Sequence, residues 1–323
     1  MKYSELKQSL KNRVEPVYIL SGSDDFLRSY SVKLIQNKCL SLPELNFLSF
    51  DGENFSQENA DAAFNSLRSV PFMSERRVVL IREYYPTAEE LKKSGIGEYL
   101  KSPSETSVLI VSNKKECKNI EKIAGTTTVN CNPDQALCVG WICNEAKKAN
   151  LSISPSVALK IAEYCLLDFS KINGELAKLT VYCVDSGVID MPAVDAVVSK
   201  ESEYRIYEMV ECISSSKYDD AYGILSDLLS KNENEQKLFV SIYSHFRRML
   251  HVAVSDESNA ALAEILGVKE YAVKMTRQQV RRFSVKRLKM ICDTFAEYDV
   301  KFKSGDIGVS EVLWNGVFTS MIA

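Results

Sequence analysis

The chain has 323 residues, 46% of them apolar and 26% charged, which is typical of a globular protein and excludes a disordered or fibrous one. This length predicts two or three domains, each large enough to bury a core. The net charge of -3 excludes a general attraction to nucleic acid, so any such contact must come from a local basic patch. Residues 1–13 lack a signal-peptide core and no later run has the length of a membrane span, so a cytoplasmic protein is expected.

Residues 17–131 alternate between strand and helix patterns. Short runs rich in β-branched and aromatic residues predict strands at 17–22, 45–52, 76–85, 107–113 and 126–131. Thr87 with Glu90 predicts a capping box after the third strand, and Ser56 can cap the helix before it. Strands that alternate with helices predict a parallel sheet with helices on both faces.

From Pro133 onward the pattern is almost entirely helical. A small helical domain is predicted from helices at about 134–149, 154–165, 169–184 and 191–199, with Pro155 and Pro192 marking two of the starts. The charged stretch 199–204 is the predicted hinge. From Tyr204 to the end, apolar residues at helical spacing predict a bundle of about five longer helices.

The first strand leads through Gly22 into a helix, where a nucleotide-binding domain carries its phosphate-binding loop. That loop has the pattern G-x-x-x-x-G-K-[ST], because backbone amides wrap the phosphates and the lysine neutralises them. Here Leu27, Arg28 and Ser29 stand where the second glycine, the lysine and the hydroxyl residue belong. The side chain of Leu27 would obstruct the approach of a phosphate to the backbone.

A second position of the same site is also altered. The third strand ends in Arg82 and Glu83, and a cation cannot replace an acidic magnesium ligand at Arg82. Asp24 and Asp25 also put negative charge at the helix start, which repels phosphate. Two losses favour the fold of an ATPase without its chemistry. The alternative is an α/β domain unrelated to ATPases.

Metal and thiol chemistry are not expected. The nine cysteines are too sparse for a disulfide scaffold, and the gaps between Cys131, Cys138 and Cys143 do not match metal-ligand pairs. His245 and His251 lie on one predicted helix at a spacing that predicts different faces.

An apolar run, Pro71, Phe72 and Met73, stands just before the third strand, where a loop is expected. Its neighbours Arg68, Glu75, Arg76 and Arg77 are charged. Either the run is exposed so that a partner completes its burial, or Phe72 folds back beneath its own sheet as a plug.

Several segments, in this order, resemble the delta subunit of bacterial DNA polymerase III. They include PVYILSGSDDFL, VPFMSERRVVLI, LDFSKINGELAKLTVY, SHFRRML and DVKFKSGD, spread over nearly the whole chain. Each segment alone is a weak pattern, but their order and spacing are specific. In the LDFSKINGELAKLTVY segment, Glu175 and Lys178 match the family's helix, where an i, i+3 ion pair explains them.

The resemblance implies an AAA+-like domain without a working ATP site at 1–133, a small helical lid at 134–202 and a helical collar at 203–323. It implies a clamp-loader subunit without cofactor or catalytic residue, which opens the sliding clamp using ATP hydrolysed by other subunits. Its implied partners are the clamp, the gamma/tau and delta-prime type subunits that meet it in the collar, and primer-template DNA. The family's clamp-binding wedge falls on Pro71, Phe72 and Met73, with either Pro71 or Met73 as second anchor beside Phe72.

Residues 269–303 are the most basic part of the chain. In a collar some of these residues can contact DNA phosphates, and we predict that Arg281, Arg282 and Lys286 include such contacts. A solvated helix face or contacts with other subunits are the alternatives.

Two other functions remain open from the sequence. One is a diverged ATPase that retains weak nucleotide binding through Arg28 and Ser29, with Asn113 as a polar sensor. The other is an adaptor whose helical part binds an unrelated protein.

Overall fold

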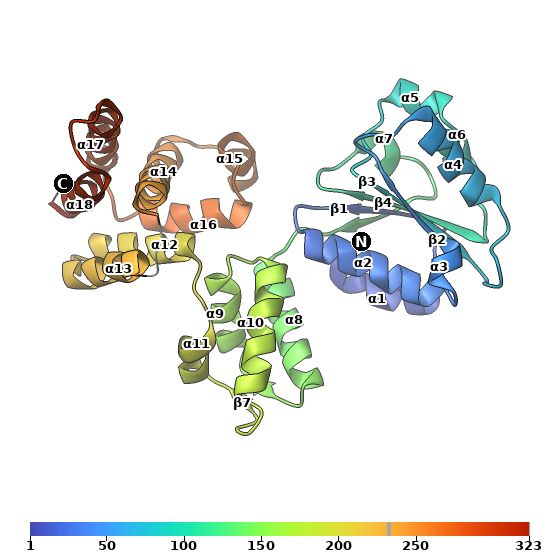
Figure 1. Ribbon diagram of the computed structural model, residues 1–323, viewed down its shortest axis with the longest axis horizontal. Coiled ribbons are helices and arrows are strands. Elements are labelled where there is room, and N and C mark those ends of the chain that lie inside the picture. The colour runs from blue at the N-terminus through green and yellow to red at the C-terminus, as the bar shows by residue number, and fades with distance from the viewer. Residues whose placement is uncertain (231–233, 323) are drawn as a thin grey trace. The chain divides into compact units, whose positions relative to one another are not determined.

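The computed structural model describes residues 1–230 and 234–322 and divides into two compact units (Figure 1). Unit 1 comprises Met1–Gly140 with Asp168–Ser170, and unit 2 comprises Trp141–Leu167 with the chain from Lys171 onward. The predicted boundary between lid and collar falls inside unit 2. The division into three domains therefore stays a prediction.

Unit 1 is built on a five-stranded parallel sheet with the order β2-β3-β4-β1-β5. Its strands are β1 (Val17–Ser21), β2 (Phe47–Asp51), β3 (Arg77–Arg82), β4 (Ser107–Asn113) and β5 (Thr127–Asn130). β1 and β4 are buried along their whole length, which is why they are continuous apolar runs rather than alternating ones. The pairing of Ser21 with Asn113 and of Arg82 with Ser112 brings the carboxyl ends of three strands to one edge.

Helices cover both faces of this sheet, as predicted. α1 (Tyr3–Asn12) and α2 (Asp25–Cys39) lie on one face, and α4 (Gln57–Arg68), α5 (Ala88–Lys93), α6 (Gly95–Lys101) and α7 (Lys118–Glu121) lie on the other (Figure 1). Thr87 and Glu90 form the predicted capping box, and Ser56 caps α4. The predicted strand 45–52 is wrong at its start, because Pro43–Asn46 forms the short helix α3 before β2 begins.

The part of unit 2 that follows α8 (Gln135–Lys148) contains α9 (Pro155–Tyr164), α10 (Phe169–Tyr182) and α11 (Met191–Val197). Pro155 and Pro192 lie in the first turns of α9 and α11, as predicted, and Ser154 and Asp190 cap those helices. The sequence did not predict the two-stranded parallel sheet of β6 (Ser152–Ile153) and β7 (Val188–Ile189). Strands of two residues are too short to show a periodic pattern.

Seven helices complete the described part of unit 2, where about five were predicted. They are α12 (Ser202–Ser214), α13 (Tyr218–Ser230), α14 (Glu235–Val254), α15 (Asn259–Leu266), α16 (Glu270–Val280), α17 (Val285–Ser304) and α18 (Val309–Ile322). The prediction missed short helices such as α15, which ends at Gly267 in the left-handed conformation that glycine favours.

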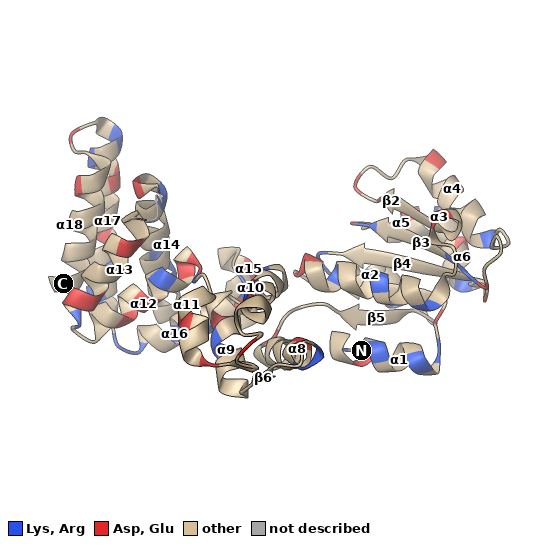
Figure 2. Ribbon diagram, turned by 60° about the horizontal axis from the view of Figure 1, so that its bottom comes forward, with Lys and Arg blue, Asp and Glu red and all other residues tan. Residues whose placement is uncertain are grey.

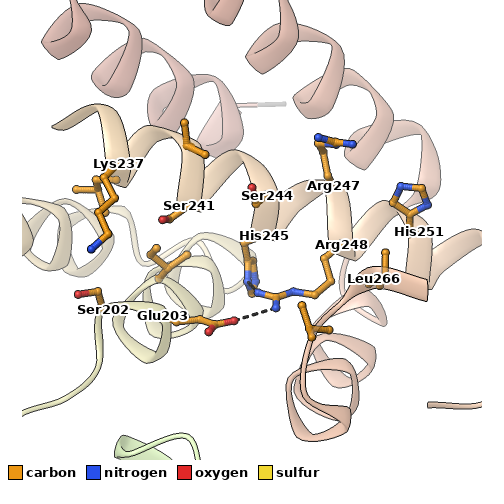
Figure 3. Close-up of a pocket in the computed structure, with 14 residues that line it drawn as sticks. Ser202, Glu203, Lys237, Ser241, Ser244, His245, Arg247, Arg248, His251 and Leu266 are labelled. Carbon is orange, nitrogen blue, oxygen red and sulfur yellow. Dashed lines mark hydrogen bonds and ion pairs between the residues drawn. The ribbon is translucent and has the colours of Figure 1, made fainter. Parts of the chain in front are cut away.

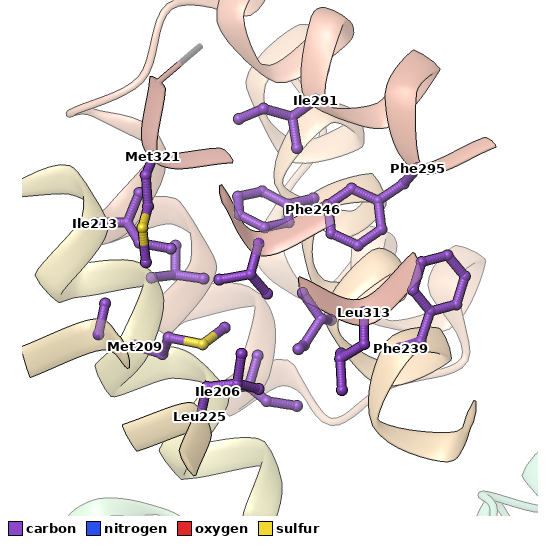
Figure 4. Close-up of a cluster of buried hydrophobic side chains, with 14 of the residues drawn as sticks. Ile206, Met209, Ile213, Leu225, Phe239, Phe246, Ile291, Phe295, Leu313 and Met321 are labelled. Carbon is purple, nitrogen blue, oxygen red and sulfur yellow. The ribbon is translucent and has the colours of Figure 1, made fainter. Parts of the chain in front are cut away.

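An aromatic cluster lies at the centre of this bundle (Figure 4). The ring of Phe295 on α17 lies 5.4 Å from Phe239 and 5.8 Å from Phe246, both on α14. Gly316 on α18 makes room for it, since a Cβ there would come within 2.8 Å of the Phe295 ring. The bundle therefore has its own buried apolar core, as the helical periodicity predicted.

Within residues 1–230 and 234–322, no helix combines the length and the apolar character needed to cross a membrane.

Candidate protein-binding site

The apolar run before β3 is exposed in the structure. We call residues 70–73 the apolar tip. Val70 is 84% exposed, Phe72 57% and Met73 77%, whereas Pro71 is half-buried. Phe72 therefore does not plug the sheet, and the alternative in which it folds back is wrong for this structure. A cluster of exposed apolar side chains is the kind of surface that a partner covers.

A buried asparagine from another segment holds the backbone of the tip. The Asn46 side chain is 0% exposed and lies at the end of α3. Its Oδ1 accepts from the Phe72 backbone N–H at 2.8 Å, and its Nδ2 donates to the Phe72 carbonyl at 2.9 Å. Both backbone groups of Phe72 are thus fixed while its side chain is left outside.

The same asparagine brings further apolar surface to the tip. Asn46 Nδ2 also donates to the Leu42 carbonyl at 3.2 Å, so Leu42 and Phe72 are bound to one nitrogen atom. Leu42 is 37% exposed and Leu45 is 53% exposed. Two segments that lie far apart in the sequence are therefore side by side here, and each carries exposed apolar side chains.

The charged neighbours of the tip are less free than the sequence suggested. Arg76 donates to the Val14 carbonyl at 3.2 Å, and Arg77 donates to the Ser69 hydroxyl. Arg68 is exposed and lies 3.4 Å from Glu98. Arg77 therefore joins the residues on either side of the tip, and Arg76 is bound to the chain before β1. Arg68 and Glu75 are the exposed charged residues beside the tip.

The loop after β1 has the place of a phosphate-binding loop but different contacts. Arg28 is 6% exposed, and its guanidinium donates to the carbonyl of Gly22 inside the loop. It also lies 3.1 Å from Asp25 and 3.5 Å from Glu83. Gly22 has a φ of +156°, and a Cβ there would lie 2.4 Å from the backbone of Cys131. The loop is closely packed, and its buried cation is paired with carboxylates.

The other residues predicted around this loop differ in their exposure to solvent. Leu27 is fully buried, whereas Ser29 and Arg82 are exposed. Asn113 is fully buried, and its side chain bonds to the backbone N–H and carbonyl of Tyr84 at 2.9 and 2.8 Å. Asn113 therefore supports the backbone after β3 and is not directed to an open site, as a sensor would be. Burial raises the pKa of the nearby Cys131 thiol to about 11.

Part of the basic segment is neutralised by acidic residues of its own helix. On α17, Lys289 pairs with Asp293 at 2.8 Å and Lys303 with Asp299 at 2.6 Å, and Figure 2 shows acidic and basic residues interspersed over the helices of unit 2. Arg282 is bound to Glu211. Within the described parts of the chain, Arg281 and Lys286 are exposed and form no ion pair. Of the three residues predicted to contact DNA, Arg282 already has an acidic partner, whereas the charges of Arg281 and Lys286 face solvent.

A pocket of about 420 Å³ opens in unit 2 between α12, α14 and the end of α15 (Figure 3). His245 and His251 both line this broad pocket, but His245 is buried and His251 is exposed, so the prediction that they point to different faces stays a prediction. Arg248 lies 2.8 Å from Glu203 and donates to His245 Nδ1 at 3.2 Å. The pocket wall is therefore a polar network in which the two terminal nitrogens of Arg248 are bound to Glu203 and His245.

Burial, together with the nearby Arg248 charge, lowers the pKa of His245 to about 3. The ring is thus neutral near pH 7. Since Arg248 donates to Nδ1, the proton is on Nε2, which donates to Gln279 Oε1 at 2.8 Å. Gln279 in turn donates to the Tyr207 carbonyl at 2.8 Å. This chain of bonds joins α12, α14 and α16.

One predicted pair is formed as expected. Glu175 and Lys178 on α10 lie 2.6 Å apart, and Glu175 also accepts from the Ser199 backbone N–H at 3.1 Å. This ion pair is a sufficient explanation for both residues.

These features define a class of protein: a parallel α/β domain with an exposed apolar tip, followed by helical elements that include a bundle. A family model described as DNA polymerase III, delta subunit, matches residues 18–130, and one described as DNA polymerase III delta subunit, C-terminal domain, matches residues 203–313. The chain belongs to the DNA polymerase III delta-subunit family.

Two relatives from Bacillus subtilis match over nearly the whole chain. The DNA polymerase III subunit delta of strain 168 is 26% identical over 328 residues, which cover 94% of this chain and 92% of the relative. The solved structure of the DNA clamp loader delta protein (YqeN) has a TM-score of 0.77 at 23% identity and covers 99% of this chain and 100% of that chain. The predicted fold class is therefore confirmed.

Proposed function

We propose that this chain is the clamp-loader subunit that binds the sliding clamp through the apolar tip and opens the ring, so that it can be loaded onto primed DNA in the cytoplasm. The observation that carries the proposal is the exposure of Phe72 and Met73 on a backbone fixed by Asn46. Family membership supplies the identity of the partner. The tip supplies apolar surface whose burial by a partner would stabilise the complex.

The chain would open the clamp by binding the open ring more tightly than the closed ring. Burial of a phenylalanine or methionine side chain contributes roughly 1.5 to 3 kcal/mol when it is complete. A tip that fits a pocket of the clamp better in the open or strained ring than in the closed ring shifts that equilibrium toward opening. No covalent chemistry is required of this chain.

We further propose that ATP is bound and hydrolysed by other subunits. Arg28 is bound to the carbonyl of its own loop and lies beside Asp25 and Glu83, so the loop presents carboxylates where a nucleotide would bring phosphates. A titration of the isolated chain with MgATP should show no binding below about 1 mM. Submillimolar affinity would instead favour the diverged ATPase.

The remaining partners are proposed for the helices after residue 202. The other loader subunits, of gamma/tau and delta-prime type, would pack against this bundle, and primer-template DNA would pass Arg281 and Lys286. Tyr222 is 50% exposed and Phe318 45% exposed, and Trp314 stacks between them at 5.1 and 5.8 Å. Such an aromatic strip suits burial by a neighbouring subunit.

The test of clamp binding uses the full chain and the sliding clamp of the same cell. Phe72→Ala should weaken the affinity at least about tenfold, measured by surface plasmon resonance without nucleotide. Tyr182→Ala is the matched control, because Tyr182 is also an aromatic residue exposed to 60%, but in unit 2. Unchanged affinity of Phe72→Ala would exclude the tip as the clamp-binding site.

A further inference from the structure

We propose that Asn46 is the positioning residue of the clamp-binding surface, and that this surface extends from the apolar tip onto Leu42 and Leu45. The inference rests on the proposed clamp-binding function. It adds a residue that does not touch the clamp and a second binding segment. Neither is part of the wedge that the sequence indicated.

The hydrogen bonds of Asn46 are those that only a carboxamide can make. One acceptor atom takes the Phe72 N–H, and one donor nitrogen serves the carbonyls of Phe72 and Leu42. An aspartate has no donor, so its carboxylate would face two carbonyl oxygens. An alanine would leave three buried or part-buried backbone groups without these partners.

These bonds fix the direction of the Phe72 side chain. The backbone N–H and C=O of Phe72 are both bound to the fully buried side chain of Asn46. The next residue, Met73, has a φ of +47°, a value that residues other than glycine rarely adopt. A residue in this region of conformational space persists only where its surroundings hold it. The hydrogen bonds from Asn46 to Phe72 constrain the backbone immediately before Met73.

A tip ordered before binding loses less conformational entropy when it enters a pocket. Without Asn46, the free tip would sample other backbone conformations, and binding would have to select the correct one. We therefore expect Asn46 to affect clamp affinity through Phe72, not through a contact of its own.

The second segment follows from the same bonds. Because the carbonyls of Leu42 and Phe72 both accept from one nitrogen of Asn46, the two segments lie side by side, and we assign their exposed side chains to one surface. The occupant that we assign to both segments is the clamp, since the α3 surface continues the surface proposed to bind it. Leu45→Ala should weaken clamp binding about threefold, a smaller effect than that of Phe72→Ala.

The deciding experiment is a double-mutant cycle between Asn46 and Phe72, with clamp affinity measured on full-length chains. Asn46→Ala should weaken binding about tenfold in the wild-type background and less than about twofold in the Phe72→Ala background. Asn46→Asp keeps the side-chain volume and should give a loss of similar size. Asn119→Ala is the matched control, since Asn119 also donates to a backbone carbonyl of unit 1, that of Pro86 at 2.9 Å.

A second readout does not depend on the clamp. Amide hydrogen exchange of Val70, Phe72 and Met73 should be faster in Asn46→Ala and Asn46→Asp than in the wild type, while exchange in β1 and β4 stays slow. Slow exchange in the sheet shows that the variants are folded. Unchanged exchange at the tip would overturn the positioning role.

The outcomes separate this inference from the function on which it rests. If Phe72→Ala binds normally, the proposed function itself is wrong. If Phe72→Ala loses affinity but both Asn46 variants bind normally, only the positioning role is wrong. Equal losses from Asn46→Ala in both backgrounds would also overturn it, because Asn46 would then act independently of Phe72. Normal binding by Leu45→Ala would restrict the surface to the tip.

Discussion

The guanidinium of Arg28 lies 3.5 Å from the carboxylate of Glu83, across the loop that in a nucleotide-binding domain would hold phosphate. Glu83 has a φ of +50°, and its N–H donates to the Ser112 carbonyl at 2.9 Å. The pair thus joins the helix start after β1 to the chain after β3. Arg28, at the position where a phosphate-binding loop has its lysine, has a structural role here.

Removal of this cation should destabilise unit 1. Arg28→Ala leaves the Gly22 carbonyl without its donor and the Glu83 carboxylate without its buried partner, so the free energy of unfolding should fall by about 2 kcal/mol. Urea denaturation measures the change. Arg82→Ala, an exposed arginine of the same unit, should stay within about 0.5 kcal/mol of the wild type. Equal effects of the two variants would contradict the structural role of Arg28.

The second anchor beside Phe72 should be Met73. Met73 is 77% exposed, so its side chain is free to enter a pocket, whereas Pro71 is half-buried in its own domain. Met73→Ala should therefore weaken clamp binding about tenfold, and Pro71→Ala less than about threefold. Surface plasmon resonance with the clamp distinguishes the two. A larger loss for Pro71→Ala would reverse the assignment.

The sequence predicted the parallel sheet and the tip because both depend on local pattern. β1 and β4 are continuous apolar runs, and Phe72 stands out as an aromatic residue in a loop. The position of Phe72 relative to water could not be predicted from the pattern. Both an exposed tip and a buried plug place an apolar residue before β3.

The role of Asn46 could not be predicted because Phe72, whose backbone it holds, lies 26 residues away in the sequence. The only signal was a polar residue inside the predicted strand 45–52, at the point where the structure instead ends a short helix. Similarly, the acidic partner of Arg282 is Glu211, on a different helix. Contacts that tertiary packing creates between distant segments produce no periodic pattern in a single sequence, so they cannot be predicted from it.

If the assembled loader contacts DNA through the basic segment, Arg281 and Lys286 should matter more than Arg282. The first two are exposed without an ion pair among the described residues, whereas Arg282 is bound to Glu211. The double variant Arg281→Ala, Lys286→Ala should lose up to about two phosphate contacts. Each lost contact should make the slope of log K against log salt concentration shallower by roughly 0.9. Fluorescence anisotropy from low to moderate salt measures the slope.

The control for this measurement is Lys93→Ala, an exposed lysine of unit 1 that is paired with Glu89 at 2.7 Å. It should leave the slope unchanged. The same slope in the double variant and in the wild type would favour the alternative of a solvated helix face. A large effect of Arg282→Ala would show that its bond to Glu211 opens when DNA binds.

His245 should make the chain sensitive to mild acid. Its pKa is lowered to about 3 in the folded protein by burial and by Arg248, whereas the ordinary value is 6.5. Between these values the unfolded state binds the proton more readily, so stability is fully present above pH 6.5 and is lost as the pH falls toward 3. From pH 7 to pH 5.5, this group alone should lower the free energy of unfolding by about 1 kcal/mol.

His245→Gln tests this, because glutamine keeps a polar side chain between Arg248 and Gln279 but has no proton to gain in this range. The variant should be less stable than the wild type at pH 7, since it fits the network less well, yet lose about 1 kcal/mol less on the change to pH 5.5. His251→Gln is the matched control, because His251 lines the same pocket but is exposed, and it should lose as much as the wild type. Parallel pH profiles for the wild type and His245→Gln would show that the buried imidazole is not the acid-sensitive group.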